Sequence, residues 1–115
     1  MAQRRISVAG TLNADSVFRN GSLTIDYGAG CVTLCGEELK LTPTEYKLLC
    51  LLAKDAGKVL TPTYLTNKIW GSSWESDMAS LRVHMATLRK KIEKDSDTQY
   101  IQTHIGIGYR MLKLE

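Results

Sequence analysis

The sequence predicts a single α+β domain in which short N-terminal strands precede three helices and a C-terminal β-hairpin. The length of 115 residues is that of one domain. Hydrophobic residues make up 43% of the chain and charged residues 23%, proportions that are typical of a globular protein. The spacing of the apolar residues alternates at first, then follows the period of a helix, and alternates again near the C-terminus.

The N-terminal third predicts a linker followed by three strands. Residues 1–16 show no hydrophobic period and include glycine, asparagine and aspartate, so we expect them to be a linker between domains. Between Phe18 and Leu41, three short alternating runs are separated by turn-forming stretches. This pattern predicts antiparallel strands joined by tight turns, within a folded domain that spans residues 17–115.

Several signals agree on the start of the first helix. Thr42 is a typical N-cap, Pro43 suits the first helical position, and Glu45 has the spacing of a capping box. Gly57 is expected to end this helix. The side of the helix that faces the core is predicted to carry Leu48, Leu49, Leu52, Ala53 and Ala56.

Two further helices are predicted after the first. The same start signals recur at Thr61 and Pro62, and Gly71 is placed to end a short second helix. The next residues form a polar loop of seven residues up to Asp77. Near that residue we expect the third helix to begin, and we expect it to run to about Lys94.

The third helix has two different faces. Large apolar residues recur at helical spacing on one side and predict a core-facing seam of Leu81, Met85, Leu88 and Ile92. The residues on the opposite side are small, weakly polar or basic, namely Ser80, Val83, Thr87 and Lys90. Such a face can lie closely against a flat, charged surface.

Positive charge is concentrated in the same helix. The stretch from Met78 to Lys94 holds five basic residues and one acidic residue, whereas the formal net charge of the whole chain is +3. The rest of the chain is therefore nearly neutral. One basic segment on a nearly neutral body indicates a polyanion as the binding partner.

The C-terminal residues predict a β-hairpin. Two alternating runs, Tyr100 to Ile105 and Gly108 to Leu114, flank a pair of residues that we expect to form a two-residue turn, Gly106 and Ile107. The glycines on either side of Ile107 lack the third glycine and the following helix of a dinucleotide-binding motif. We therefore interpret them as turn residues.

Several classes of protein are disfavoured. The longest apolar run, Leu48 to Ala53, is too short to span a bilayer, and the N-terminus shows no secretory signal. Cys31, Cys35 and Cys50 lack the spacing of a zinc site or a disulfide framework, so we expect free thiols in a cytoplasmic protein. No P-loop, HExxH or GxSxG motif is present, so we expect no enzyme, no cofactor and no metal site.

The order of the elements is that of a winged helix-turn-helix. In this arrangement a short helix precedes a recognition helix that enters the DNA major groove, and a hairpin forms the wing. Four motifs in order, LTPTEYKLLCLLAKDAGKVLT, LTNKIWG, LRVHMATLRKKIE and IQTHIGIGYRM, resemble the C-terminal DNA-binding domain of OmpR/PhoB-type response regulators. The resemblance covers residues 17–115. Within that family, the last two motifs are most similar to regulators of potassium-transport (Kdp) operons.

The resemblance implies a particular architecture and set of partners. It implies a four-stranded N-terminal sheet and, in the parent protein, a phosphorylatable receiver domain. It also implies sequence-specific binding to double-stranded DNA, with two copies arranged head-to-tail on direct repeats. The loop before the third helix, with Trp74 and Glu75, would then contact RNA polymerase.

The resemblance also implies a role for individual residues. Ser80, Val83 and Thr87 would face base edges in the major groove. Phosphate contacts would come from side chains of the third helix, from an aromatic residue at the end of the short second helix and from a tyrosine of the wing, namely His84, Arg89, Lys90 or Lys91, Trp70 and Tyr109.

The chain departs from the family pattern at a few of these positions. Many relatives carry an arginine where this chain has Ile105, and an arginine or another polar residue at Pro62. Reading of the minor groove by the wing then requires Arg110 or His104 as a substitute. Two other departures affect the third helix. Thr87 stands where some relatives have an arginine, and it cannot make the bidentate contact of an arginine with guanine. Arg82 stands in place of a common acidic residue and adds a possible contact with DNA.

Each of these roles has a structural alternative. Trp70 and Tyr109 could pack in the core or the hairpin, His84 could be a boundary residue, and Trp74 could fold back onto the core. For the whole domain, the alternative is a protein-interaction winged helix whose basic face binds an acidic partner. The absence of acidic or bulky apolar residues along the outer face of the third helix disfavours it.

Overall fold

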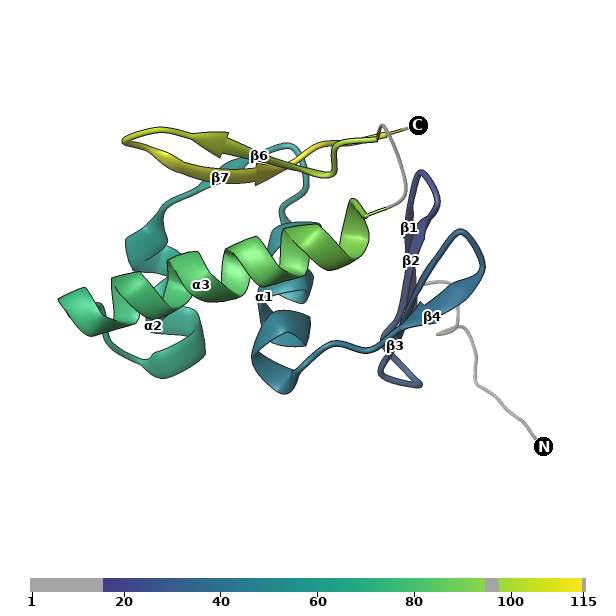
Figure 1. Cartoon of the computed structure of the whole chain (residues 1–115), viewed down its shortest axis with the longest axis horizontal. Helices are drawn as coiled ribbons and strands as arrows, with labels where there is room; N and C mark the ends of the chain where they lie inside the picture. The colour runs from purple at the N-terminus through teal and green to yellow at the C-terminus, as the bar shows by residue number, and fades with distance from the viewer. Residues whose placement is uncertain (1–15, 95–97, 115) are drawn as a thin grey trace. The chain divides into compact units, whose positions relative to one another are not determined.

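The computed structural model describes residues 16–94 and 98–114 (Figure 1). The predicted linker, residues 1–16, lies outside this range except for Ser16. The described residues form two compact units, one that ends at Lys40 and one that begins at Leu41. None of the helices in these ranges is both long and apolar enough to cross a membrane.

The first unit is a four-stranded antiparallel sheet in the order β1-β2-β3-β4. Its strands are β1 (Val17–Asn20), β2 (Leu23–Asp26), β3 (Cys31–Leu34) and β4 (Glu37–Leu39). Alternate residues of the two central strands are buried, as expected for a sheet with one apolar face: Leu23, Ile25, Val32 and Leu34.

The alternating runs predicted three strands, whereas the sheet has four. The additional strand is β1, which pairs with β2. Its one buried residue, Asn20, is polar, so the strand carries no alternating apolar pattern by which it could be recognised. The four strands implied by the family resemblance are confirmed.

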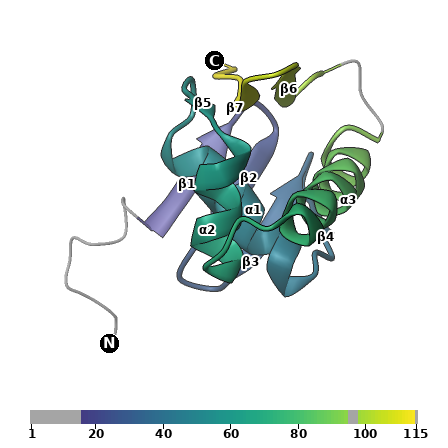
Figure 2. The same cartoon turned by 90° about the vertical axis from the view of Figure 1, so that its left-hand side faces the viewer.

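The second unit contains three helices and a three-stranded sheet. The helices are α1 (Pro43–Lys54), α2 (Pro62–Trp70) and α3 (Glu75–Ile92), and they pack against one another. The strands are β5 (Val59–Leu60), β6 (Ile101–His104) and β7 (Gly108–Met111), in the order β5-β7-β6. Figures 1 and 2 show the β6–β7 hairpin beside α3, with β5 next to β7. This arrangement confirms the predicted winged helix-turn-helix.

The predicted capping box of α1 is present. The Thr42 hydroxyl accepts a hydrogen bond from the Glu45 N–H at 3.2 Å, and the Glu45 carboxylate accepts one from the Thr42 N–H at 3.0 Å. The predicted end at Gly57 is wrong, because α1 ends at Lys54. The N–H of Gly57 instead donates to the carbonyl of Met111 at 2.8 Å, so this turn is set by a contact with β7 that is distant in sequence.

The second helix begins and ends as predicted, with Thr61 as N-cap and Gly71 in the left-handed conformation at φ 77°. The predicted seven-residue loop after it is too long, since α3 already begins at Glu75. The Asp77 carboxylate accepts hydrogen bonds from the Trp74 N–H at 2.8 Å and from the Ser72 hydroxyl at 2.6 Å. Asp77 therefore caps the helix from inside its first turn instead of preceding it.

The C-terminal hairpin also differs in detail from the prediction. His104 pairs with Gly108, which leaves three residues in the turn where two were expected. The Ile107 N–H donates to the His104 carbonyl at 2.8 Å, and Gly106 adopts a φ of +79°. The third helix ends at Ile92 instead of Lys94. The next residue, Glu93, is the C-cap of the helix, and its side chain accepts hydrogen bonds from the backbone of Tyr100 and Ile101.

Candidate nucleic-acid interface

The third helix buries its apolar seam and leaves the opposite face in solvent. Leu81, Met85, Leu88 and Ile92 are all buried, as predicted. Val83 lies on the opposite side and has 63% of its surface exposed. Lys90, two turns further along the same face, is exposed too, while Ser80 and Thr87 are half-buried at the edge of this face. The outer face of α3 is therefore small, weakly polar and positively charged.

Thr87 has its hydroxyl proton engaged within the helix. The hydroxyl donates to the carbonyl of Val83 at 3.1 Å. A threonine held in this way points its methyl group and its remaining oxygen lone pairs outward. It can therefore accept a hydrogen bond or make an apolar contact on the outer face of α3.

One flank of α3 faces the wing hairpin. The Arg89 guanidinium donates to the Thr103 hydroxyl of β6 at 2.9 Å, and its Nε lies 3.7 Å from a carboxylate oxygen of Glu93. Arg82 is exposed two turns earlier on the same flank. Arg82 is thus open to a ligand, whereas Arg89 is held between the helix and the wing.

The other flank of α3 faces the first two helices. The Lys91 ammonium lies 2.7 Å from the Glu45 carboxylate, which is nearly completely buried. The ring of His84 lies 5.9 Å from that of Trp70 at the end of α2. Of the two lysines predicted to reach phosphates, Lys91 is therefore used in an internal ion pair, and Lys90 is the one that points into solvent.

The buried carboxylate of Glu45 is held in its charged form. Burial raises its pKa, but hydrogen bonds from Lys91 and from the Thr42 backbone, together with the charges of Lys91 and His84, hold the pKa below the ordinary value of 4.5. Because the pKa is lower in the folded chain than in the unfolded chain, Glu45 stabilises the fold fully above pH 4.5. This contribution is lost as the pH falls through the lower, folded-state value.

We expect Glu45→Gln to remove this pH dependence. At neutral pH the variant should lose about 1 kcal/mol of unfolding free energy, because the ion pair with Lys91 is replaced by a weaker hydrogen bond from the Lys91 ammonium to an uncharged amide oxygen. Urea denaturation between pH 7 and pH 3 measures both quantities, and the exposed Glu38→Gln variant is the control. A Glu45→Gln protein that lost stability with acid as steeply as the original chain would contradict this assignment.

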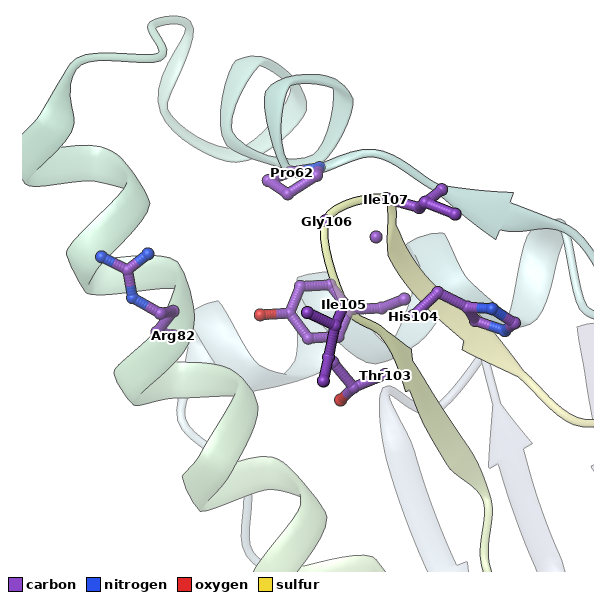
Figure 3. A pocket seen from close by; sticks show the side chains of 9 residues that line it. Pro62, Arg82, Thr103, His104, Ile105, Gly106 and Ile107 are labelled. Atoms are coloured by element: carbon purple, nitrogen blue, oxygen red, sulfur yellow. The ribbon is translucent and has the colours of Figure 1, made fainter.

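A cleft of about 310 Å³ lies between the wing and the helices (Figure 3). Pro62 at the start of α2 and Arg82 of α3 form two of its walls, and the wing residues from Thr103 to Tyr109 form the third. The wing tip is apolar and open to solvent, with Ile105 exposed over 93% of its surface. Arg82 is the one cation among the residues that line the cleft.

The two faces of the wing carry different side chains. Tyr109 pairs with Thr103, and both line the cleft on the side of α3. Arg110 lies on the opposite face, where its guanidinium donates to the side-chain amide oxygen (Oε1) of Gln102 at 2.7 Å. His104 contacts the same oxygen at 3.1 Å, and Figure 3 shows its ring pointing away from Arg82. Neither candidate substitute for the missing arginine is therefore directed toward α3.

The loop before α3 presents an exposed tryptophan. Its backbone is fixed by Asp77, yet the Trp74 side chain is 73% exposed. The alternative in which Trp74 folds back onto the core is therefore wrong. Glu75 follows as the first residue of α3 and is also exposed, so both residues of the predicted polymerase-contact loop lie on the surface.

The structure brings most of the predicted contact residues to one surface and leaves a few elsewhere. Ser80, Arg82, Val83, Thr87 and Lys90 share the outer face or the wing flank of α3, with Tyr109 across the cleft. Trp70 and His84 form a half-buried pair at its other edge. Lys91 and Arg110 are engaged internally, as described above.

Two residues that shape this surface were not recognised from the sequence. Glu93 binds backbone groups of the wing, and Thr103 receives the guanidinium of Arg89. The spacing of Arg89 and Glu93, four residues apart on a helix, was the available signal. Throughout the described ranges, no three His, Cys, Asp or Glu side chains gather closely enough to bind a metal ion.

Comparisons with known proteins agree with this geometry. Residues 36–111 match the family described as "Transcriptional regulatory protein, C terminal". The transcriptional regulatory protein KdpE of Staphylococcus aureus is 43% identical over 99 residues, which cover 84% of this chain and 43% of that protein. The KDP operon transcriptional regulatory protein KdpE of Escherichia coli is 37% identical over 113 residues, which cover 97% of this chain and 49% of that protein.

A solved structure shares the fold. The Klebsiella pneumoniae RstA DNA-binding domain, crystallised in complex with the RstA box, aligns with a TM-score of 0.74 at 30% identity, covering 84% of this chain and 96% of that one. The chain spans about half the length of the curated relatives that it matches. From the family match, these relatives and the winged-helix architecture together, it follows that the chain belongs to the C-terminal domains of transcriptional regulatory proteins of the OmpR/PhoB type.

Proposed function

We propose that this chain binds double-stranded DNA sequence-specifically, as the effector domain of a two-component response regulator that controls transcription. The observation that carries the proposal is the outer face of α3, which is free of bulky side chains, bears positive charge and is backed by a fully buried seam. An α-helix with such a face fits the major groove of B-DNA. The solved RstA domain, a relative with the same fold, was crystallised with its DNA site.

The side chains of this face suit base edges. Val83 offers an exposed apolar surface for a thymine methyl group. Thr87, whose proton is donated to the helix, accepts from the amino group of adenine or cytosine or contacts a methyl group. Ser80 adds a hydroxyl at the same edge. We therefore expect the chain to prefer A·T-containing positions opposite the middle of α3.

The phosphate contacts come from the surroundings of this face. Lys90 and Arg82 extend from α3 into solvent, and Tyr109 and Trp70 border the same surface. Their cationic and N–H or O–H groups suit phosphate oxygens, which fix the register of a protein on the duplex. The wing tip would contact the adjacent sugar-phosphate edge or minor groove with the apolar Ile105, because no cation lies there.

Selection of bound duplexes from a random pool, followed by a salt titration, tests the proposal. We expect a specific site, with log affinity falling by about 0.9 per phosphate contact for each tenfold increase in salt. An enriched pair of direct repeats would support the head-to-tail arrangement of two copies. A chain that bound no duplex at low salt, and instead bound acidic proteins, would favour a protein-interaction domain.

The parent protein would join this domain to a receiver domain and act at a promoter. The relatives are about twice as long as the chain, which leaves room for such a domain in a full-length protein. Because two of them are named KdpE, the Kdp operons of potassium transport are the first targets to test.

We expect Trp74→Ala to separate activation from DNA binding. The exposed indole stands on a backbone fixed by Asp77, away from the outer face of α3, and exposed tryptophans are enriched in protein interfaces. The variant should keep the DNA affinity of the original chain while transcription with RNA polymerase falls at least fivefold, an estimate of about 1 kcal/mol or more at a contact. Normal activation by the variant would remove Trp74 from the polymerase surface.

A further inference from the structure

Glu93, the first residue after α3, binds the beginning of the wing. One of its carboxylate oxygens accepts hydrogen bonds from the backbone N–H groups of Tyr100 at 2.8 Å and Ile101 at 3.0 Å. Both of these residues are buried, and Ile101 is the first residue of β6. An ionised acceptor makes stronger hydrogen bonds than a neutral one, so this side chain fixes the start of the wing to the end of the helix.

A second link runs through Arg89, one turn earlier on α3. Its Nε lies 3.7 Å from the other carboxylate oxygen of Glu93, and its Nη1 donates to the Thr103 hydroxyl at 2.9 Å. Thr103 follows Ile101 by two residues, so both lie on the same face of β6. The last turn of α3 therefore holds β6 at two places, through one connected set of side chains.

This connection links the two parts of the molecule that the proposed function places on DNA. Base contacts belong to the outer face of α3 and backbone contacts to Tyr109 on the wing. A duplex presents its groove and its backbone at a fixed separation. If the two protein parts are already held in the matching arrangement, less conformational freedom is lost on binding.

We propose that Glu93 is a positioning residue of the DNA interface, which locks the wing to α3 through the Tyr100 and Ile101 amides and through Arg89 and Thr103. This inference rests on the proposed function. It also gives Arg89 a role different from a simple phosphate contact, because its guanidinium is already shared between the helix and the wing.

The direction in which Glu93→Ala changes DNA affinity distinguishes a positioning role of Glu93 from a purely electrostatic one. Glu93 borders a shallow surface depression together with Arg89, Lys90 and Lys94. An acidic residue in such a place repels phosphates, so charge alone predicts that Glu93→Ala binds DNA more tightly. Positioning predicts the opposite, weaker binding.

Duplex binding by Glu93→Ala, Glu93→Gln and the charge-matched control Glu38→Ala tests the inference in the whole chain. We expect Glu93→Ala to bind the selected duplex about tenfold more weakly than the original chain. Glu93→Gln should retain most of the affinity, because its amide oxygen can still accept from both backbone groups. Glu38→Ala, on the exposed β4, should bind as the original chain does.

Two further readouts separate positioning from a general loss of structure. The Ile101 amide should exchange with solvent faster in Glu93→Ala, because its acceptor is removed. Tyr109→Phe, which removes the proposed phosphate contact of the wing, should weaken binding in the original chain but add little in Glu93→Ala. Such non-additivity is expected when one residue acts by placing the other.

Thr103→Val provides the same test in a variant that keeps the shape of its side chain. It removes the acceptor of Arg89 and should also reduce the effect of Tyr109→Phe. The inference would be overturned if Glu93→Ala bound the duplex as tightly as the original chain or more tightly. It would also be overturned if Thr103→Val folded and its loss of binding free energy simply added to that of Tyr109→Phe. Either result would leave the proposed function intact. Failure of the unaltered chain to bind any duplex would instead overturn the proposed function.

Discussion

Gly108→Ala is expected to lower the free energy of unfolding by about 3 kcal/mol, the upper part of the range for overpacked sites. Gly108 begins β7, where the strand lies against Leu60 at the end of β5 and against Thr61, the next residue. A Cβ at this position would overlap the carbonyl oxygen of Leu60, and would lie 2.8 Å from the Leu60 carbonyl carbon and 3.1 Å from the Thr61 Cα. All three neighbours are backbone atoms, so they cannot move aside as a flexible side chain would.

Thermal or urea denaturation measures this effect, and Gly28→Ala is the matched control. A Cβ at Gly28 would find its nearest neighbour, a side-chain oxygen of Asp26, at 3.5 Å, which is an ordinary contact. The control should change stability by less than about 0.5 kcal/mol, whereas Gly108→Ala should lower Tm by roughly 15 °C in a domain of this size. Equal stability of the two variants would show that β7 and Leu60 are not in close contact.

The largest effect on binding is expected from reversing two charges on α3. Arg82 and Lys90 are both exposed, and within the part of the chain that the structure describes neither forms an ion pair. Arg82→Glu combined with Lys90→Glu should leave the fold intact. The double variant should reduce affinity for every duplex about 100-fold at 0.1 M salt and lower the salt slope by about 2, the value for two lost phosphate contacts.

Lys47→Glu combined with Lys54→Glu is the control for net charge, because both lysines are exposed on α1. Because neither lysine belongs to the proposed interface, salt ions should screen most of the effect of these charges on the duplex. A second comparison is Thr87→Ala, which should alter the preferred bases and leave the salt slope unchanged. Equal losses in the α1 and α3 double variants would mean that net charge alone, and not the surface of α3, determines binding.

Local signals account for what the sequence predicted well. The capping box of α1 involves residues only three apart, and the N-cap of α2 is formed in the same way by Thr61. The buried seam of α3 follows from residue spacing along a single helix. These features are fixed by neighbours in the chain, so the sequence displays them directly.

The features that could not be predicted from the sequence depend on contacts between residues that are distant along the chain. The short strand β5 exists because it pairs with β7 about fifty residues later, and two residues are too few to show a period. Lys91 is separated by 46 residues from Glu45, the partner that removes it from the surface. Glu93 and Gly108 also act on segments that lie elsewhere in the chain, and no spacing rule identifies such partners.

The residues of the candidate interface were predicted one by one, and the structure shows which of them are free to contact a ligand. Val83 and Lys90 point into solvent on the outer face of α3, whereas Lys91 and Arg110 are hydrogen-bonded to other side chains. Helical spacing places Lys90, and not Lys91, on the outer face of α3, but it does not reveal the partner of Lys91, because Glu45 lies 46 residues away in the sequence. Their roles differ because a helix turns by about 100° per residue, which directs one to Glu45 and the other outward.

Amide chemical shifts of the isotope-labelled chain, recorded while its selected duplex is added, test most directly whether α3 enters the major groove. The account predicts that the largest changes fall on residues 80–90 of α3, with smaller ones at Trp70 and Tyr109. Changes concentrated on β1 to β4, with residues 80–90 unaffected, would contradict it.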